Sequence, residues 1–222
     1  MNSAPPRLYV ITDRTATGGR PLVDVVAQAL EGLAGGDLDP RSVAVQLREK
    51  DLEGRALTEL ARGLRAVTAP VGVRLYINDR IDVAIAVDAD GVHLGGASLA
   101  AAEARALLPA MAVGVSAHGP ADVRRELGQA TFAVYGPLRD TPSKRRYGLP
   151  LGFESLADAA KAGLPLLAIG GIEATDVPAA IAAGAHGIAC IRPVMAASDP
   201  AAALRALARA LASSPVGSPY QT

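Results

Sequence analysis

The chain of 222 residues contains eight short apolar runs, and polar or glycine residues directly follow most of them. The runs lie at Leu8–Ile11, Val43–Leu47, Val73–Ile77, Gly91–Leu94, Ala112–Val115, Phe132–Tyr135, Leu166–Ile169 and Gly187–Ile191. Alanine-rich stretches of helical spacing separate them, and such an alternation of strand and helix indicates a parallel sheet. Eight units in a chain of this length predict an α/β fold, a single (β/α)8 TIM barrel, whose catalytic residues lie on the loops after the strands.

We expect one barrel domain over residues 1–212 and a disordered tail over 213–222, because the tail is rich in Ser, Pro and Gly. Ser98 is the expected N-cap of the helix that starts at Leu99. The spacing of apolar residues predicts helices at Pro21–Leu33, Leu57–Val67, Ile81–Ala86, Leu99–Leu108, Pro120–Leu127, Glu154–Ala162, Ala174–Ala183 and Pro200–Ala212.

Composition narrows the class of protein. There are 22 basic and 22 acidic residues, so no net charge attracts nucleic acid or an anionic membrane. No stretch of 18 uncharged apolar residues and no secretory signal are visible, which predicts a cytoplasmic protein. The single Cys190 excludes an intramolecular disulfide and a multi-cysteine metal site, and it is expected to be buried. The oligomeric state stays open, and a homo-oligomer is compatible with the sequence.

Three long hydrogen-bond donors alternate across the end of the run Val43–Leu47. Gln46, Arg48 and Lys50 share one side of the strand if the strand persists that far. Such a group suits a multiply charged anion such as diphosphate. A solvated charge cluster at the end of a strand is the alternative interpretation, and the spacing alone does not decide between them.

Asn78 and Asp79 follow the run Val73–Ile77. An aspartate at the mouth of a barrel can bind Mg²⁺, which prefers carboxylate, water and phosphate oxygens. Either side chain could equally cap the helix that follows.

The segment 136–152 has no helical or strand period and contains a basic run, and we interpret it as a lid over the barrel mouth. Thr141, Ser143 and Lys144 offer two hydroxyls and an ammonium group to a phosphate. A basic loop without a ligand is the alternative.

Gly170 and Gly171 follow the run Leu166–Ile169, and Arg192 follows Gly187–Ile191. In phosphate-handling barrels these two loops form the usual phosphate site, where glycines let backbone N–H groups approach the anion. A tight turn that needs positive φ is the alternative. Two separate anion sites would suggest two phosphorylated substrates and therefore group transfer.

Ser116 and His118 follow the run Ala112–Val115 and could point toward the mouth. His118 could shuttle a proton near neutral pH. A hydrogen-bonded structural histidine is the alternative. His93, inside a strand, and His186, in a turn, are interpreted as structural.

Seven segments between Leu8 and Val194 together resemble the thiamine phosphate synthase/TenI superfamily. They are "LYVITDR", "VQLREKDL", "YINDRIDVAIAVDADGVHLG", "GVSAHG", "YGPLRDTPSK", "LLAIGGI" and "GAHGIACI". The resemblance implies a transferase of thiamine biosynthesis. In the reaction of this family, hydroxymethylpyrimidine diphosphate loses diphosphate to give a pyrimidine cation. The nitrogen of a thiazole phosphate then captures this cation.

The resemblance also implies roles for individual residues. Asp79 would bind Mg²⁺, Ser116 would lie by the pyrimidine, and Gly171 with the backbone around Ile191 and Arg192 would hold the thiazole phosphate. The candidates for catalysis are Lys144, Arg48, His118 and Ser116. The diphosphate would be held by Gln46, Arg48, Lys50, Asn78, Thr141, Ser143 and Lys144.

Two departures from the synthase pattern keep other functions open. Ser98 stands where synthases carry a second Mg²⁺ carboxylate, and Ser143 stands where threonine is usual. TenI-type thiazole tautomerases also lack that aspartate and use a histidine at the position of His118, so an isomerase is the alternative function. A non-catalytic binder of thiamine precursors is the third. Gln46, Lys50 and Asp79 favour the synthase, because a tautomerase has no diphosphate to hold.

Overall fold

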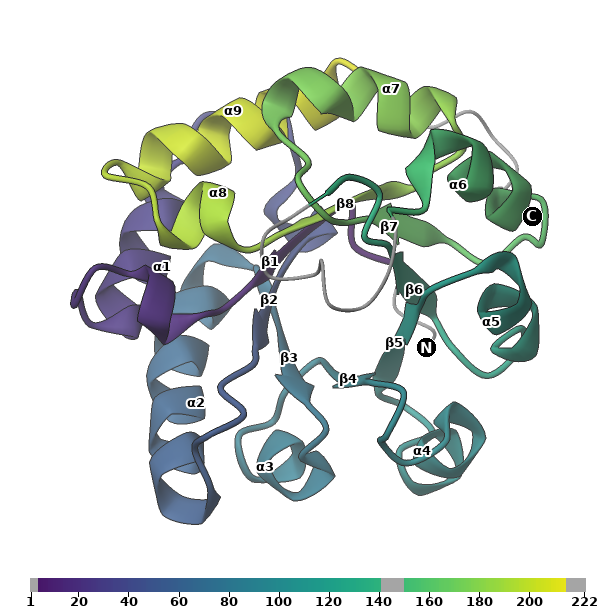
Figure 1. Ribbon diagram of the computed structural model, residues 1–222. Coiled ribbons are helices and arrows are strands. Elements are labelled where there is room, and N and C mark those ends of the chain that lie inside the picture. Colours follow the sequence, from purple (N-terminus) through teal and green to yellow (C-terminus); the bar gives the residue numbers. More distant parts are fainter. Residues whose placement is uncertain (1–3, 141–149, 215–222) are drawn as a thin grey trace.

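A computed structural model describes residues 4–140 and 150–214 and contains a closed barrel of eight parallel strands (Figure 1). Each strand pairs with the next one along the chain, and β8 closes the barrel against β1. The predicted TIM barrel is therefore confirmed. The strands are β1 (Leu8–Ile11), β2 (Val43–Leu47), β3 (Arg74–Asn78), β4 (Gly91–Leu94), β5 (Ala112–Ala117), β6 (Phe132–Tyr135), β7 (Leu166–Ala168) and β8 (Gly187–Cys190).

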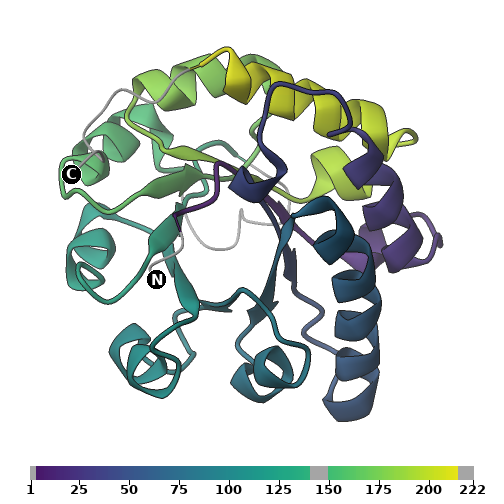
Figure 2. The same ribbon diagram turned by 180° about the vertical axis from the view of Figure 1, so that it is seen from behind.

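Helices surround the barrel on its outside, as the views from its two ends show (Figures 1 and 2). They are α1 (Leu22–Glu31), α2 (Gly54–Thr68), α3 (Ile81–Ala86), α4 (Ala101–Leu107), α5 (Pro120–Arg125), α6 (Gly152–Ala160), α7 (Val177–Ala182), α8 (Arg192–Met195) and α9 (Pro200–Ala212). Short 3-10 helices lie at η1 (Arg14–Ala16), η2 (Pro40–Ser42), η3 (Ala69–Val71) and η5 (Ala174–Asp176). Within the described residues, no helix is long and apolar enough to cross a membrane.

The apolar faces of these helices follow the predicted period. In α2, Leu57, Ala61, Leu64 and Thr68 are buried, at the spacing that lines one side of a helix. Pro200 opens α9, where no N–H donor is needed, and the carboxylate of Asp199 accepts a hydrogen bond from the first turn. The predicted bounds of α3 and α9 are confirmed residue for residue.

Ser98 does not cap α4, which corrects the sequence-based prediction. The helix begins at Ala101, two residues later than expected, and its N-cap residue is Ala100. The Ser98 hydroxyl instead contacts the carboxylate of Asp79 and accepts a hydrogen bond from the backbone N–H of Gly95 (2.7 Å). A tertiary contact at the barrel mouth has therefore overridden the local preference of serine for a cap.

Aromatic rings fill the inside of the barrel, although aromatic residues make up 3% of the chain. Tyr9 packs edge-on against Tyr76 and Phe132, with ring centroids 5.4 and 5.2 Å apart. Glycines make room for these rings. A Cβ atom on Gly91 would lie 2.3 Å from the ring of Tyr76, and one on Gly114 would lie 2.6 Å from the ring of Phe132. The floor of the barrel is therefore a packed core.

The interior side chains nearest the C-terminal ends of the strands divide the barrel mouth into two halves. Strands β2 to β5 contribute the polar half, which consists of Gln46, Asn78, His93 and Ser116. The remaining strands and the residues that directly follow them contribute the apolar half, which consists of Ile11, Val134, Ile169 and Ile191. The chain therefore places its polar chemistry on one side of the mouth.

Candidate active site

Gln46 and Asn78 connect the ends of β2 and β3. The amide nitrogen of Gln46 donates a hydrogen bond to the side-chain oxygen of Asn78 (2.8 Å). The amide oxygen of Gln46 is buried and has no hydrogen-bond partner among the described residues. A buried acceptor without a partner is destabilising, so a hydrogen-bond donor on a ligand would bind favourably at this oxygen.

Strand β2 ends at Leu47, so the alternation that would place Gln46, Arg48 and Lys50 on one side does not continue past it. The reason is a crossing contact, because the backbone N–H of Arg48 donates to the hydroxyl of Thr12 (2.9 Å) and the chain leaves the ladder. Arg48 is half-buried and Lys50 is exposed. Both cations project from a loop at the mouth.

Glu49 is a site-shaping residue that the sequence analysis missed. It is 6% exposed, and its carboxylate accepts from the backbone N–H of Arg14 at 3.1 and 3.2 Å. Burial raises the pKa of Glu49, while hydrogen bonds from Thr12 and Arg14 act in the opposite direction. Glu49 thus ties the loop after β1 to the loop that carries Arg48 and Lys50. Glu49 lies within a run of charged residues, and nothing in that local pattern indicates that this one side chain is buried.

Asp79 stands at the mouth with φ of 60°, in the left-handed region that aspartate tolerates better than most residues. Its carboxylate accepts from the side-chain amide of Asn78 (2.6 Å) and from the Ser98 hydroxyl. The N-cap of α3 is Arg80, with no side-chain hydrogen bond, so the capping interpretation of Asn78 and Asp79 is wrong.

The ligands around Asp79 fit Mg²⁺ only if a substrate supplies further oxygen ligands. Among the described residues, no cluster of three or more His, Cys, Asp or Glu side chains could hold a metal by itself. Mg²⁺ commonly uses one or two carboxylates together with substrate phosphates and water. Asp79 therefore fits a Mg²⁺ ion that a diphosphate helps to hold.

Ser116 and His118 lie at the end of β5, as predicted. The ring nitrogen Nδ1 of His118 is 2.7 Å from the carbonyl oxygen of Gly136, which can only accept, so Nδ1 carries a proton. The Nε2 atom of the exposed His118 ring remains for proton transfer. His118 thus makes the structural hydrogen bond of the alternative interpretation through Nδ1, and its Nε2 atom can still transfer a proton.

His93 reaches the site through Ser116, which the sequence analysis did not anticipate. Its Nε2 atom is 3.1 Å from the hydroxyl oxygen of Ser116. Burial lowers the pKa of His93 to about 3, while the charges of Asp79 and Arg48 act in opposite directions on it. The ring is neutral at physiological pH.

Two other titratable groups are not part of the mouth. Cys190 is buried as predicted, and burial raises the pKa of its thiol to about 12. His186 lies just before β8, at the opposite end of the barrel from the mouth. Burial lowers the pKa of His186 to about 4.

The loops after β7 and β8 contain a glycine turn and the start of a short helix. Gly170 and Gly171 adopt φ of 101° and 67°, so the tight positive-φ turn of the alternative interpretation is present. Directly after β8 and Ile191, the short helix α8 begins at Arg192. A short extra helix at this place completes the phosphate sites of many TIM barrels. The helix α8 is an addition to the helices predicted from sequence.

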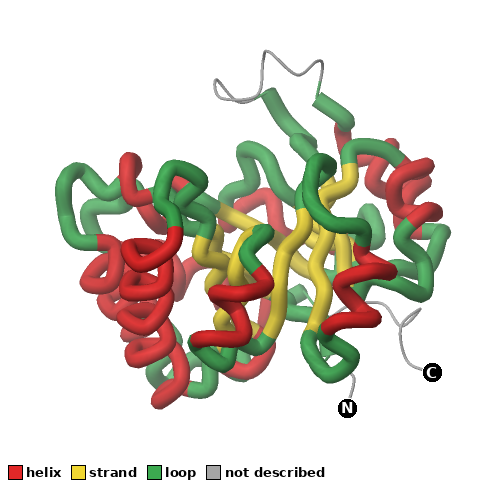
Figure 3. Tube along the Cα trace, turned by 90° about the horizontal axis from the view of Figure 1, so that it is seen from below, coloured by secondary structure: helices red, strands yellow, loops and turns green. Residues whose placement is uncertain are grey.

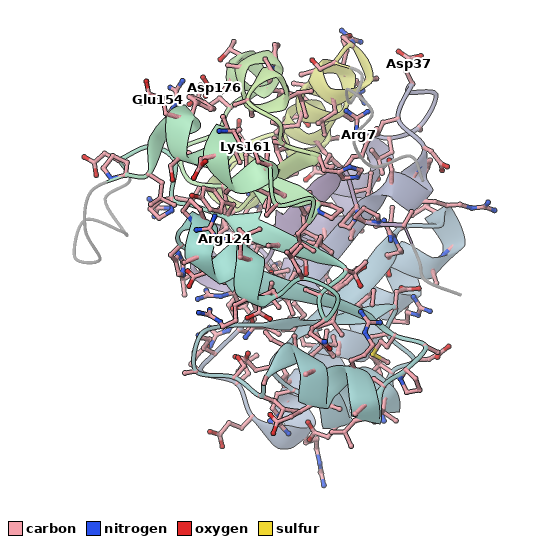
Figure 4. The ribbon with its side chains drawn as sticks, turned by 90° about the vertical axis from the view of Figure 1, so that its right-hand side faces the viewer. Arg7, Asp37, Arg124, Glu154, Lys161 and Asp176 are labelled. Carbon is pink, nitrogen blue, oxygen red and sulfur yellow. The ribbon has the colours of Figure 1, made fainter. Side chains whose placement is uncertain are left out.

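The two ends of the predicted lid are joined to the barrel. Leu138 donates its backbone N–H to Ile169 (2.8 Å), and the N–H of Leu151 donates to Pro137 (2.9 Å). Figure 3 shows these described ends rising from the same end of the strands. Arg139 pairs with Asp176, which Figure 4 places with Glu154 at this end of the molecule, far from Arg7 and Asp37. Thr141, Ser143 and Lys144 lie outside the described residues.

Comparison with known proteins agrees with this geometry. Residues 8–194 match the family model of thiamine monophosphate synthase. The chain belongs to this family. It is 43% identical over 209 residues to the thiamine-phosphate synthase of a Roseiflexus species, covering 93% of this chain and 85% of the relative. It is 41% identical to the thiamine-phosphate synthase of Xanthobacter autotrophicus, covering 92% of this chain and 94% of the relative.

A solved structure supports the same assignment. Thiamine phosphate pyrophosphorylase from Pyrococcus furiosus superimposes on this member of the family with a TM-score of 0.80 at 31% identity. The superposition covers 92% of this chain and 95% of that one. A 3-hexulose-6-phosphate synthase, at 22% identity and a TM-score of 0.62, shows the shared fold alone.

Proposed function

We propose that the protein is a thiamine-phosphate synthase, a transferase of thiamine biosynthesis. It joins hydroxymethylpyrimidine diphosphate to thiazole phosphate and releases diphosphate. The observation that carries the proposal is the pair of hydrogen bonds that connects Gln46 to Asn78 and Asn78 to Asp79 at the mouth. The relatives that cover nearly the whole chain carry the same activity in their names.

The reaction breaks the bond between the pyrimidine methylene carbon and the diphosphate oxygen, and the electron pair leaves with the diphosphate. The methylene carbon becomes a cation, and the lone pair of the thiazole nitrogen forms the new carbon–nitrogen bond. Arg48, Lys50 and Lys144 meet the negative charge that develops on the leaving group. Preorganised cations and donors at that place lower the barrier.

Asp79 would hold Mg²⁺, with the diphosphate oxygens as further ligands. The ion would neutralise charge on the departing diphosphate. Asn78 fixes the Asp79 carboxylate by donating to one oxygen, and the Ser98 hydroxyl contacts the other.

The second substrate lies across the mouth in this proposal. Gly171 and the backbone around Ile191 and Arg192 hold the thiazole phosphate at the loops after β7 and β8. The apolar half of the mouth, with Ile169 and Ile191, lies near this site. Apolar walls exclude water, which would otherwise capture the pyrimidine cation before the thiazole nitrogen does.

Phosphorus NMR of the protein with Mg²⁺ and both substrates tests the function. Diphosphate and thiamine phosphate should appear together. The Arg48→Ala variant should release diphosphate about 10² to 10³ times more slowly, because one preorganised donor is lost. Arg62→Ala, which removes an exposed arginine on α2, is the matched control and should react at the normal rate. An unchanged rate in Arg48→Ala would contradict the assignment.

The same samples distinguish the other functions. A tautomerase would turn over thiazole carboxylate phosphate without metal and would lose this activity in His118→Ala. A non-catalytic binder would bind both ligands tightly and convert neither. The names of the relatives favour the transferase. The single domain over 1–212, the cytoplasmic location and a homo-oligomer stay predictions.

A further inference from the structure

Three polar side chains form a line through the inside of the barrel, from its packed floor to its mouth. The hydroxyl of Tyr9 in β1 is 3.4 Å from Nδ1 of His93 in β4. The Nε2 atom of His93 is 3.1 Å from the hydroxyl oxygen of Ser116 in β5. Tyr9 is fully buried and His93 is 3% exposed, whereas Ser116 is half-buried at the mouth.

We propose that this line has a fixed direction, in which Tyr9 donates to His93, His93 donates to Ser116, and Ser116 donates its hydroxyl hydrogen to the pyrimidine substrate. Tyr9 and His93 are then positioning residues, and they restrict the pyrimidine site to a substrate with a hydrogen-bond acceptor there. The part of this inference that concerns the substrate rests on the proposed function.

The direction follows from the hydroxyl of Tyr9. Among the described residues, His93 is the hydrogen-bond partner of the Tyr9 hydroxyl. If Tyr9 donates to Nδ1, the single proton of the neutral ring sits on Nε2. In the opposite tautomer, Nδ1 would donate to Tyr9, and the hydroxyl hydrogen of a fully buried tyrosine would have no acceptor. An unsatisfied buried donor is expensive, so the first tautomer is preferred.

Packing holds the histidine ring in the orientation that this requires. The ring centroid of His93 lies 5.7 Å from that of Tyr9 and 6.3 Å from that of Phe132. A Cβ atom on Gly114 would lie 2.9 Å from Nδ1 and would push the ring aside. The ring thus fits between two aromatic neighbours, and the glycine on β5 leaves just enough room for it.

The consequence reaches the mouth through Ser116. Because its oxygen accepts from Nε2 of His93, its own hydrogen is left to donate. An unprotonated ring nitrogen of a pyrimidine is a suitable acceptor, and a ring C–H at the same place is not. In the reversed direction, Ser116 would donate inward and would present lone pairs to the substrate, which would select a donor instead.

Nitrogen-15 NMR of ligand-free protein with labelled histidine tests the direction without any turnover. The two ring nitrogens of His93 should report a neutral ring with its proton on Nε2. A proton on Nδ1 would overturn the proposal. The spectrum does not depend on substrates, so it would decide the direction even if diphosphate release were absent and the proposed function had failed.

A double-mutant cycle tests the effect on the substrate. Tyr9→Phe should raise KM for the pyrimidine diphosphate up to about tenfold, the value of one hydrogen bond, and leave KM for the thiazole phosphate unchanged. In the Ser116→Ala background, Tyr9→Phe should have no further effect, because the line already ends at His93. Additive effects, or an equal rise of both KM values, would contradict the positioning role.

Tyr135→Phe is the matched control. It also removes a hydroxyl from a buried tyrosine of the barrel, but this hydroxyl is bonded to Ser155. It should leave both KM values unchanged. If Tyr135→Phe raised the pyrimidine KM as much as Tyr9→Phe does, general loosening of the barrel would explain the effect and the proposal would be wrong.

Discussion

His186 is expected to make the fold sensitive to mild acid. It lies in the turn before β8, where burial lowers its pKa to about 4 and the charges of Arg7 and Arg74 act in the same direction. The carbonyl of Pro5 acts against these effects, and both ring nitrogens are shielded from solvent. Between pH 6.5 and 4, His186 binds a proton in the unfolded chain but not in the folded chain. The stability that His186 contributes is therefore present above pH 6.5 and is lost as the pH falls toward 4.

The size of the effect follows from the width of this window. One unit of pKa difference corresponds to about 1.4 kcal/mol. Between pH 7.5 and 5.0 the unfolded histidine titrates over about 1.5 units below its pKa, which gives a loss of about 2 kcal/mol in the free energy of unfolding. Urea unfolding at both pH values measures it.

The His186→Gln variant isolates this contribution. Its free energy of unfolding should fall by about 2 kcal/mol less than that of the parent protein between the two pH values. His118→Gln removes an exposed histidine and should keep the full loss. Equal losses in the parent and in His186→Gln would refute the reasoning, because the buried ring would then take up its proton in the folded state as well.

Three further perturbations test other parts of the structure. Ser98→Asp should raise the affinity for Mg²⁺ in the absence of diphosphate, measured by calorimetry, because a second carboxylate would join Asp79. Glu49→Ala should lower the free energy of unfolding by about 1–3 kcal/mol in urea, since buried donors lose their acceptor, and an equally stable variant would contradict this. Gly187→Ala should cost about 3 kcal/mol or more, because its Cβ atom would lie 2.1 Å from a backbone oxygen. A Cβ atom on Gly119 would meet open space, so Gly119→Ala should keep the free energy of unfolding of the parent protein.

The barrel was predictable from sequence because its repeating unit is local. Each strand is a short apolar run and each long helix has an apolar stripe, so both patterns can be recognised within a few residues. The bounds of the 13-residue helix α9 match the prediction for this reason. The helix α8 was missed because it spans four residues, Arg192–Met195, which is too short for a helical period to appear.

The location of several candidate residues was also predictable, because residues at or just after the C-terminal ends of the strands of a parallel barrel must gather at one end. Gln46, Asn78, Asp79 and Ser116 all do so. What the sequence could not supply was the pairing among them. The contact of Ser98 with Asp79 and that of Tyr9 with His93 join residues 19 and 84 positions apart. No local period encodes which interior residues of a closed barrel face each other.

The division of the mouth into a polar and an apolar half suits the proposed reaction, in which two charged substrates react through a cation. Arg48 and Lys50 follow β2, and Gln46 and Asn78 lie at the ends of β2 and β3, where the leaving diphosphate would stay bound. The walls that face them are apolar, including Ile169 and Ile191. A mouth that was polar all round would hold water against the cation, whereas one that was apolar all round could not hold the diphosphate. Buried His93 and Tyr9 then let Ser116 present one oriented donor without adding a charge to the site.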